Sequence, residues 1–169
     1  IAHKSDVGGV MVGVGSESAV RQSFELMMSK VRSRVPGATI NGITICQMVK
    51  GKEVLMGMTR DEQFGPVITF GLGGVFVEIM KDVSQRIAPL TKHDVDTMVR
   101  SIRSYPILTG ARGGRTADIE SLKDTIFRIS QIALDFPEIS ELEVNPVMVG
   151  DEGKGTYAVD ALVVLRREN

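Results

Sequence analysis

Apolar residues recur at intervals of three and four positions in three stretches of the chain, which is the spacing of an amphipathic helix. We expect the first helix over residues 16–35, because Ser16 can cap its first turn and Pro36 follows its end. The second is expected over residues 91–104 and the third over residues 118–135. Each would present one apolar stripe, so we expect helices that flank a sheet.

Alternating apolar and polar residues indicate strands in the intervening segments. Residues 43–49 and 53–59 predict two strands of a hairpin, with a turn at Gly51–Lys52 between them. Residues 66–70 predict a third strand, which runs into the glycine cluster at residues 71–74. Strands mixed with helices and joined by hairpins favour an α+β fold with a largely antiparallel sheet.

A second hairpin is expected near the end of the chain, from residues 141–149 and 156–165, with a turn over residues 150–155. If the turn is centred between Glu152 and Gly153, residues whose numbers add to 305 face each other. The prediction therefore pairs Asn145 with Asp160.

Composition narrows the class of protein. The 169 residues are 43% hydrophobic and 24% charged, as in a globular protein, and suffice for one domain or a large part of one. The net charge of −1 indicates neither a nucleic-acid-binding protein nor one attracted to anionic membranes. No apolar run has the length of a membrane span and no signal peptide is visible, so we expect a cytoplasmic protein. Because the chain opens on Ile1 inside a motif-like segment, we interpret it as part of something longer.

Cys46 is the single cysteine of the chain, which excludes an intramolecular disulfide and every metal site built from several cysteines. It lies in the apolar run ITICQMV, and we therefore expect a buried, unreactive side chain.

The predicted closing hairpin also suggests a metal site. Glu141, Glu143 and Asn145 alternate with apolar residues, so a strand would place them on one face. Asn145 opposite Asp160, with Glu143 one step away, provides hard oxygen ligands of the kind that Mg²⁺ shares with phosphate and water. A solvated hairpin face with an ordinary polar pair explains the same pattern equally well.

Three further segments carry groups that bind phosphate. His3 can accept and return a phosphoryl group, with Lys4 and the Gly8–Gly9 turn beside it, although a solvated terminal histidine is the simpler explanation. Gly71–Gly74 can present backbone N–H groups to phosphate oxygens, or can be only a tight turn. Gly110–Arg115, GARGGR, carries two arginines suited to phosphate or carboxylate, or is a solvated loop.

Taken together, the segments HKSDVGGV, VKGKEVLMGMTRDEQFGPVITFGLGGVFVEIMKDVSQRIAPL, LTGARGG and ELEVNPV…VDA resemble one family over essentially the whole chain. This family is the ATP-grasp portion of NDP-forming acyl-CoA synthetases, whose best-known members are ADP-forming acetyl-CoA synthetases, relatives of the β subunit of succinyl-CoA synthetase. The resemblance implies that residues 1–169 form a single ATP-grasp portion. It also implies an ATP-grasp-type mixed sheet, with the N-terminal ATP-grasp subdomain missing or incomplete.

The resemblance implies roles for individual residues. Asn145 and Asp160 would bind Mg²⁺, with Glu143 as an auxiliary group. His3 would relay the phosphoryl group, with Lys4 nearby. The remaining nucleotide contacts would come from the adenine-pocket residues Gln47, Met48 and Val49, from Glu53 near the ribose, and from Gly71, Gly73 and Gly74 over the phosphates.

The implied activity is that of an acid–thiol ligase, which interconverts acyl-CoA, ADP and phosphate with free acid, CoA and ATP. Energy would pass through an acyl phosphate and phosphohistidine, with Mg²⁺ and ATP or ADP as cofactors. The partner would be a CoA-binding and phosphohistidine domain or an α subunit, and we expect an oligomer that binds neither nucleic acid nor membrane. The alternative is a non-catalytic nucleotide-sensing domain of a fusion with a protein acetyltransferase.

Overall fold

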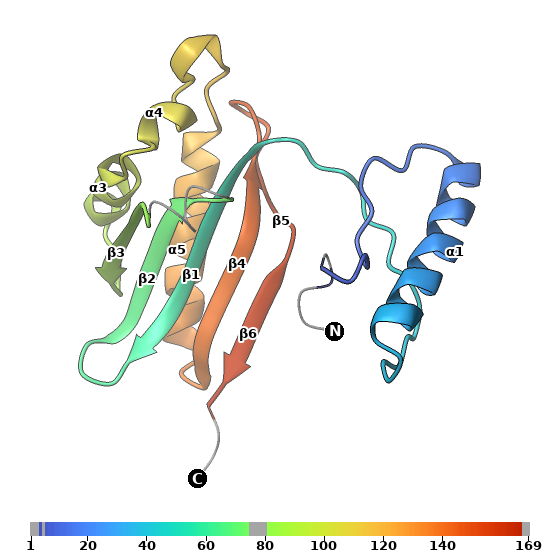
Figure 1. The fold of residues 1–169 in the computed structure, drawn as a ribbon. Coiled ribbons are helices and arrows are strands. Elements are labelled where there is room, and N and C mark those ends of the chain that lie inside the picture. Colours follow the sequence, from blue (N-terminus) through green and yellow to red (C-terminus); the bar gives the residue numbers. More distant parts are fainter. Residues whose placement is uncertain (1–3, 5, 75–80, 167–169) are drawn as a thin grey trace. The chain divides into compact units, whose positions relative to one another are not determined.

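The computed structural model describes residues 4, 6–74 and 81–166 (Figure 1). The chain divides into two compact units, Ile1–Met48 and Val49–Asn169. Within the described ranges, no helix is long and apolar enough to cross a membrane.

The first unit contains the predicted N-terminal helix, α1, over Glu17–Arg34. Ser16 caps it as expected, because its Oγ accepts a hydrogen bond from the backbone N–H of Ala19 at 3.2 Å. The predicted strand over residues 43–49 is wrong, since these residues, all of them described, adopt no regular structure. The prediction of a buried Cys46 is wrong as well, because this cysteine is exposed.

The second unit is built on an antiparallel sheet of six strands, with the order β3-β2-β1-β4-β5 and with β6 also paired to β4 (Figure 1). The strands are β1, Lys52–Asp61; β2, Gly65–Leu72; β3, Val83–Ile87; β4, Ile139–Val149; β5, Thr156–Ala158; and β6, Ala161–Leu165. Because β1 lies between β2 and β4, both of its edges are occupied. This explains why residues 43–49 cannot be its hairpin partner.

Two long helices cover one face of this sheet: α3, Lys92–Ser101, and α5, Ile119–Asp135 (Figure 1). Thr91 and Asp94 form a capping box at the start of α3, and the hydrogen bonds from Thr91 lower the pKa of the Asp94 carboxyl. The predicted helix over residues 91–104 is too long, because it is followed by the separate short helix α4, Tyr105–Leu108, and the 3₁₀ turn η1, Ala111–Gly113.

Asp82 gives the physical reason for the early end of α3. Its carboxylate accepts the backbone N–H groups of Arg103 at 2.8 Å and Ser104 at 2.7 Å. Those two N–H groups would otherwise continue the helical pattern, so a long-range acceptor ends the helix where the local sequence does not.

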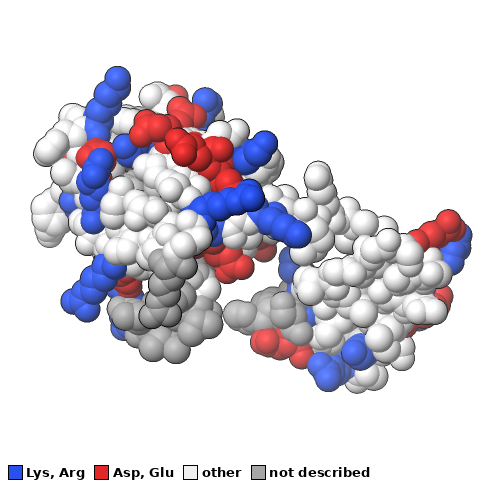
Figure 2. Space-filling model, turned by 90° about the horizontal axis from the view of Figure 1, so that it is seen from above, with Lys and Arg blue, Asp and Glu red and all other residues white. Residues whose placement is uncertain are grey.

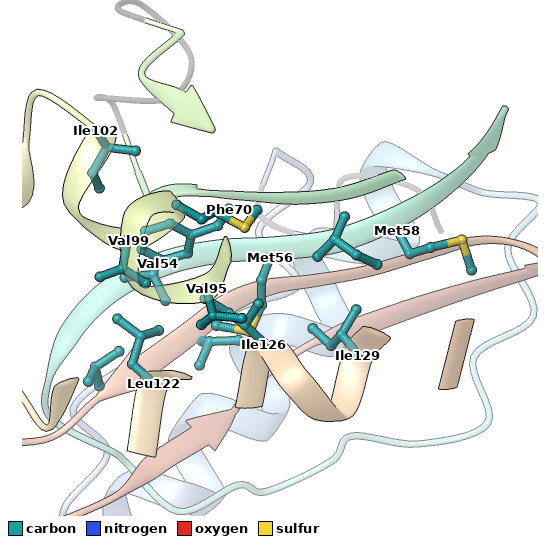
Figure 3. Packing of buried hydrophobic residues seen from close by; sticks show 14 of the residues in the cluster. Val54, Met56, Met58, Phe70, Val95, Val99, Ile102, Leu122, Ile126 and Ile129 are labelled. Atoms are coloured by element: carbon teal, nitrogen blue, oxygen red, sulfur yellow. The ribbon is translucent and has the colours of Figure 1, made fainter. Parts of the chain in front are cut away.

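The core lies between the sheet and these helices (Figure 3). Met56 of β1 and Phe70 of β2 are fully buried against Val95 of α3 and Ile126 of α5. The other face of the sheet, opposite the helices, carries the alternate residues of β1 and β4, including Leu55, Gly57 and Glu143. This arrangement follows from the two-residue period of a strand.

A β-bulge in β4 changes which residues face the core. Val54 pairs with Val147 and Met56 with Val144, so two residues of β4, Asn145 and Pro146, lie opposite the single residue Leu55. The core-facing positions of β4 therefore switch from even to odd numbers. The bulge keeps both halves of β4 in the core and sets Asn145 at the irregular point.

The predicted register of the closing hairpin is confirmed. Val147 pairs with Ala158 in β5, and Glu143 pairs with Leu162 in β6, as the expected sum of 305 requires. The single strand expected over residues 156–165 is interrupted at Val159 and Asp160, which separate β5 from β6.

Candidate functional site

Asn145 and Asp160 face each other where β5 gives way to β6. The backbone N–H of Asn145 donates to the carbonyl of Asp160 at 3.0 Å, and Val159 donates to the carbonyl of Pro146 at 3.0 Å. The Asp160 carboxylate accepts the N–H of Ala161 at 3.0 Å. Both side chains of the predicted pair are exposed, so they are accessible to a solvated ligand.

Glu143 lies beside this pair. The amide Nδ2 of Asn145 donates to Glu143 Oε1 at 3.1 Å, so the two side chains share the sheet face opposite the helices. With Nδ2 directed at Glu143, Oδ1 is the atom of Asn145 suited to bind a cation. The structure thus places the Asn145 amide against the Glu143 carboxylate, and places Asp160 opposite Asn145 on the neighbouring strand.

Two carboxylates and one amide oxygen fit Mg²⁺, which usually keeps waters and phosphate oxygens in its shell. Among the described residues, no group of three or more His, Cys, Asp or Glu side chains could hold a metal ion. A cation at Asn145 and Asp160 would therefore depend on phosphate and water for its remaining ligands, rather than on a cage made only of protein.

Glu53 and the glycine cluster also lie together. The N–H of Gly73 donates to the carbonyl of Glu53 at 2.8 Å. A Cβ atom at Gly73 would lie 3.0 Å from the backbone and Cβ of Glu53, and one at Gly74 would lie 3.2 Å from Glu53 Oε2. Gly71 has a similar constraint, because its Cβ would lie 2.8 Å from the Asp82 carbonyl. Close chain packing alone therefore disfavours any side chain at Gly71 and Gly73, whether or not phosphate binds. At Gly74 the near atom is the flexible end of the Glu53 side chain, and the φ of +67° favours glycine.

One row across the sheet connects the glycines with the predicted metal ligands. Gly71 pairs with Leu55, Leu55 lies opposite the bulge at Asn145, and Asn145 pairs with Asp160. Neighbouring strands are about 4.8 Å apart, so Gly71 and Asn145, two strands apart, are separated by roughly 10 Å. Phosphates of one nucleotide could contact both parts of this row.

Three predicted site residues of the first unit, Lys4, Gln47 and Met48, lie within the described residues. The Lys4 carbonyl accepts the N–H of Gly9 at 2.8 Å and closes a turn that includes Gly8, whose φ is +75°. Gln47 and Met48 are exposed in a segment without regular structure, and Val49 begins the second unit. His3 lies outside the described residues.

The GARGGR segment contacts the turn between β4 and β5. Arg115 forms an ion pair with Asp151 at 2.9 Å, and Lys52 Nζ donates to the Arg115 carbonyl. Figure 2, a view from above Figure 1, shows acidic and basic side chains side by side on the larger unit rather than a patch of one sign. The contacts of Arg115 are therefore those of a structural connection to the hairpin turn.

Asp118 is a residue whose full contacts the sequence did not reveal. Its Oδ2 accepts the N–H of Gly155 at 2.9 Å and its Oδ1 accepts the N–H of Ser121 at 3.1 Å. These hydrogen bonds lower the pKa of the Asp118 carboxyl, and the bond from Gly155 has the largest effect. Its place before an apolar helical stripe indicates the helix cap, whereas nothing local indicates the bond to Gly155.

A sequence profile of the ATP-grasp domain matches residues 1–165, and so includes both units. The chain belongs to the ATP-grasp family. Its antiparallel sheet with flanking helices is therefore that of an ATP-grasp portion, as the resemblance implied. That residues 1–169 form a single such portion stays a prediction.

Relatives of this ATP-grasp chain are acyl-CoA synthetases. It is 46% identical over 166 residues to the β subunit of ADP-forming acetate–CoA ligase I of Pyrococcus furiosus, with 98% of this chain and 71% of the relative covered. It is 48% identical over 170 residues to ADP-forming acetate–CoA ligase I of Archaeoglobus fulgidus, with 99% of this chain but 24% of the relative covered. The predicted resemblance to ADP-forming acetyl-CoA synthetases is confirmed.

Solved structures agree with these relatives. The dinucleotide-forming acetyl-coenzyme A synthetase 1 of Ca. Korarchaeum cryptofilum, in complex with coenzyme A and Ca-AMPCP, has a TM-score of 0.87 and 42% identity, with 98% of this chain and 72% of that chain covered. A complex of the same enzyme with coenzyme A and Mg-AMPPCP has a TM-score of 0.80 and 39% identity, with coverages of 98% and 71%. The predicted ATP-grasp-type α+β fold is thereby confirmed.

Proposed function

We propose that this chain is the nucleotide-binding part of an ADP-forming acyl-CoA synthetase, an acid–thiol ligase, with acetyl-CoA as the first acyl-CoA to test. The observation that carries the proposal is the opposition of Asn145 and Asp160 across the hairpin, beside Glu143. The named relatives, which are ADP-forming acetate–CoA ligases, support the reaction class.

In this proposal Asn145 and Asp160 bind Mg²⁺ and Glu143 holds the Asn145 amide in the orientation that presents Oδ1. When bound, Mg²⁺ neutralises charge on the nucleotide phosphates. Glu53, which lies against Gly73 and Gly74, belongs to the nucleotide-binding surface together with Gly71.

Further roles in this proposal come from the family resemblance. It assigns Gln47, Met48 and Val49 to the adenine pocket. His3 exchanges a phosphoryl group with the nucleotide, because an imidazole is nucleophilic near neutral pH, and Lys4 supplies positive charge to the transferred phosphate.

The partner in this proposal is a CoA-binding and phosphohistidine domain or α subunit, which forms and consumes the acyl phosphate. One relative is a β subunit, and another is a single chain of which this chain covers 24%, so ATP-grasp portions of this type occur both as subunits and within longer chains. We further propose a cytoplasmic oligomer. The alternative of a nucleotide-sensing domain fused to a protein acetyltransferase has no support among these relatives, which are ligases.

The test measures ATP formation from acetyl-CoA, ADP and phosphate by the complete polypeptide with its CoA-binding partner. We expect turnover that requires Mg²⁺. We also expect the Asp160→Asn variant to lose this turnover at limiting Mg²⁺. Asp124→Asn is the matched control, because this exposed aspartate of α5 pairs with Arg128, one helical turn away on the same helix. It should behave as the unmodified protein.

Two outcomes would contradict the proposal. An unchanged Mg²⁺ dependence in Asp160→Asn would remove this residue from the metal site. Nucleotide binding without turnover on any of several acyl-CoAs would favour the sensing domain instead.

A further inference from the structure

Asp118 bonds to both ends of the turn between β4 and β5. Its backbone N–H donates to the carbonyl of Gly150 at 2.9 Å, and its Oδ2 accepts the N–H of Gly155 at 2.9 Å. The same carboxylate caps α5 through Ser121. One side chain thus joins a helix that packs on the core to the turn that begins and ends at these two glycines.

Neighbouring contacts strengthen this connection. The hydroxyl of Thr156, the first residue of β5, lies 3.1 Å from Ser121 Oγ and 2.7 Å from Thr125 Oγ1, both on α5. On the other side of the turn, Glu152 donates its N–H to the carbonyl of Thr116 at 3.0 Å. The turn is therefore attached to α5 and to the segment before it.

The candidate metal site depends on the hairpin register that this turn begins. A slip of one residue would place Asn145 opposite a different residue and turn the facing side chains to the other side of the sheet. The strand that transmits the register, β5, has only three residues, and Tyr157, Ala158 and Val159 are exposed. The pairing of β5 has little buried apolar surface to stabilise it. The contacts that attach the turn to α5 are therefore more important for the register than they would be beside a long buried strand.

We propose that Asp118 is a positioning residue of the candidate Mg²⁺–nucleotide site, because it holds the β4–β5 turn in the conformation that keeps Asn145 opposite Asp160. The inference rests on the proposed function, which assigns Mg²⁺ to that pair. Asp118 itself is the N-cap residue before α5 and is no ligand in this proposal. Its effect on the metal passes through Gly155 and the register.

The experiment separates this role from helix capping. Asp118→Ser keeps a good capping residue for α5, but one oxygen on a shorter side chain replaces two carboxylate oxygens, of which Oδ1 accepts from Ser121 and Oδ2 from Gly155. Thr91→Ala is the matched control, because it removes the side-chain cap of α3 and leaves the bonds from Asp118 to Ser121 and Gly155 in place. In the complete protein with its partner, Mg²⁺ is titrated calorimetrically against a fixed concentration of ADP, and amide hydrogen exchange is measured at Gly155 and Ala161.

We expect Asp118→Ser to weaken the apparent Mg²⁺ affinity about tenfold, in the range found for supporting residues of metal sites, and to speed exchange at both amides. Thr91→Ala should lower the melting temperature without changing either readout. Unchanged Mg²⁺ affinity in Asp118→Ser, while Asp160→Asn loses binding, would overturn the inference and leave the proposed function standing. If the unmodified protein binds no Mg²⁺–ADP, the proposed function fails and this inference fails with it.

Discussion

Arg60 offers a quantitative test of how α5 is held against the sheet. From β1, its Nη2 donates to the carbonyls of Ala133 at 2.8 Å and Phe136 at 3.3 Å, and its Nε donates to that of Ile139 at 3.1 Å. These acceptors are one carbonyl in the last turn of α5, the carbonyl of the C-cap residue Phe136, and the first carbonyl of β4. The guanidinium therefore serves carbonyls at the end of α5, where the helix dipole is negative. The Phe136 carbonyl also accepts the N–H of Ile139 at 3.1 Å.

The expected loss of unfolding free energy in Arg60→Met follows from these contacts. A hydrogen bond to a charged group contributes about 1.5–3 kcal/mol, and interaction with a helix terminus adds about 0.3–1 kcal/mol. Because Phe136 is exposed, water can replace the longest of the three bonds, so we do not add them in full. We expect the free energy of unfolding of the second unit to fall by about 2–3 kcal/mol, and by less in Arg60→Lys, whose ammonium cannot form the planar fork.

Urea unfolding followed by circular dichroism, with amide hydrogen exchange at the end of α5, measures this loss. The control is Arg128→Met, which removes an exposed ion pair with Asp124 on the same helix and should cost about 0.3–0.5 kcal/mol. If Arg60→Met costs no more than this control, the guanidinium does not hold the helix end and the reasoning is refuted.

The remaining predictions concern packing, backbone approach and pH. Phe70→Ala should cost about 3–5 kcal/mol in urea unfolding, because the ring is fully buried and leaves a cavity; a cost below 1 kcal/mol would contradict this packing. Gly73→Ala should lower the melting temperature and weaken ADP binding, since its Cβ would press on the neighbouring strand, whereas Gly37→Ala meets nothing within 4 Å and should be neutral. Asp94 and Asp118 have lower pKa values in the folded protein than in the unfolded chain. Their contribution to the free energy of unfolding is therefore present above the unfolded pKa of about 3.9, and it is lost as the pH falls from there through the folded pKa values. Unfolding free energy measured from pH 6 to 3 should therefore decrease, and less steeply in Asp118→Ala; equal slopes would show that Asp118 adds nothing to acid sensitivity.

Local signals were sufficient for two of the long helices and for the hairpin register. Ser16 and Asp118 begin helices where their side chains can accept the first N–H groups, and these interactions span only three residues. The opposition of Asn145 and Asp160 also followed from the sequence, because a tight turn sets the register of both arms of a hairpin.

Tertiary structure decided which segments pair and where they are attached. Residues 43–49 alternate like a strand, but a strand needs a free edge, and β2 and β4 occupy both edges of β1. The β-bulge at Asn145, the early end of α3 at Asp82 and the bond from Gly155 to Asp118 all depend on groups distant in the chain. Caps and turns are determined within a few residues, whereas strand partners and long-range acceptors are selected by the packing of the whole unit. For that reason the sequence determined the candidate metal pair, and only the folded chain showed what holds it in place.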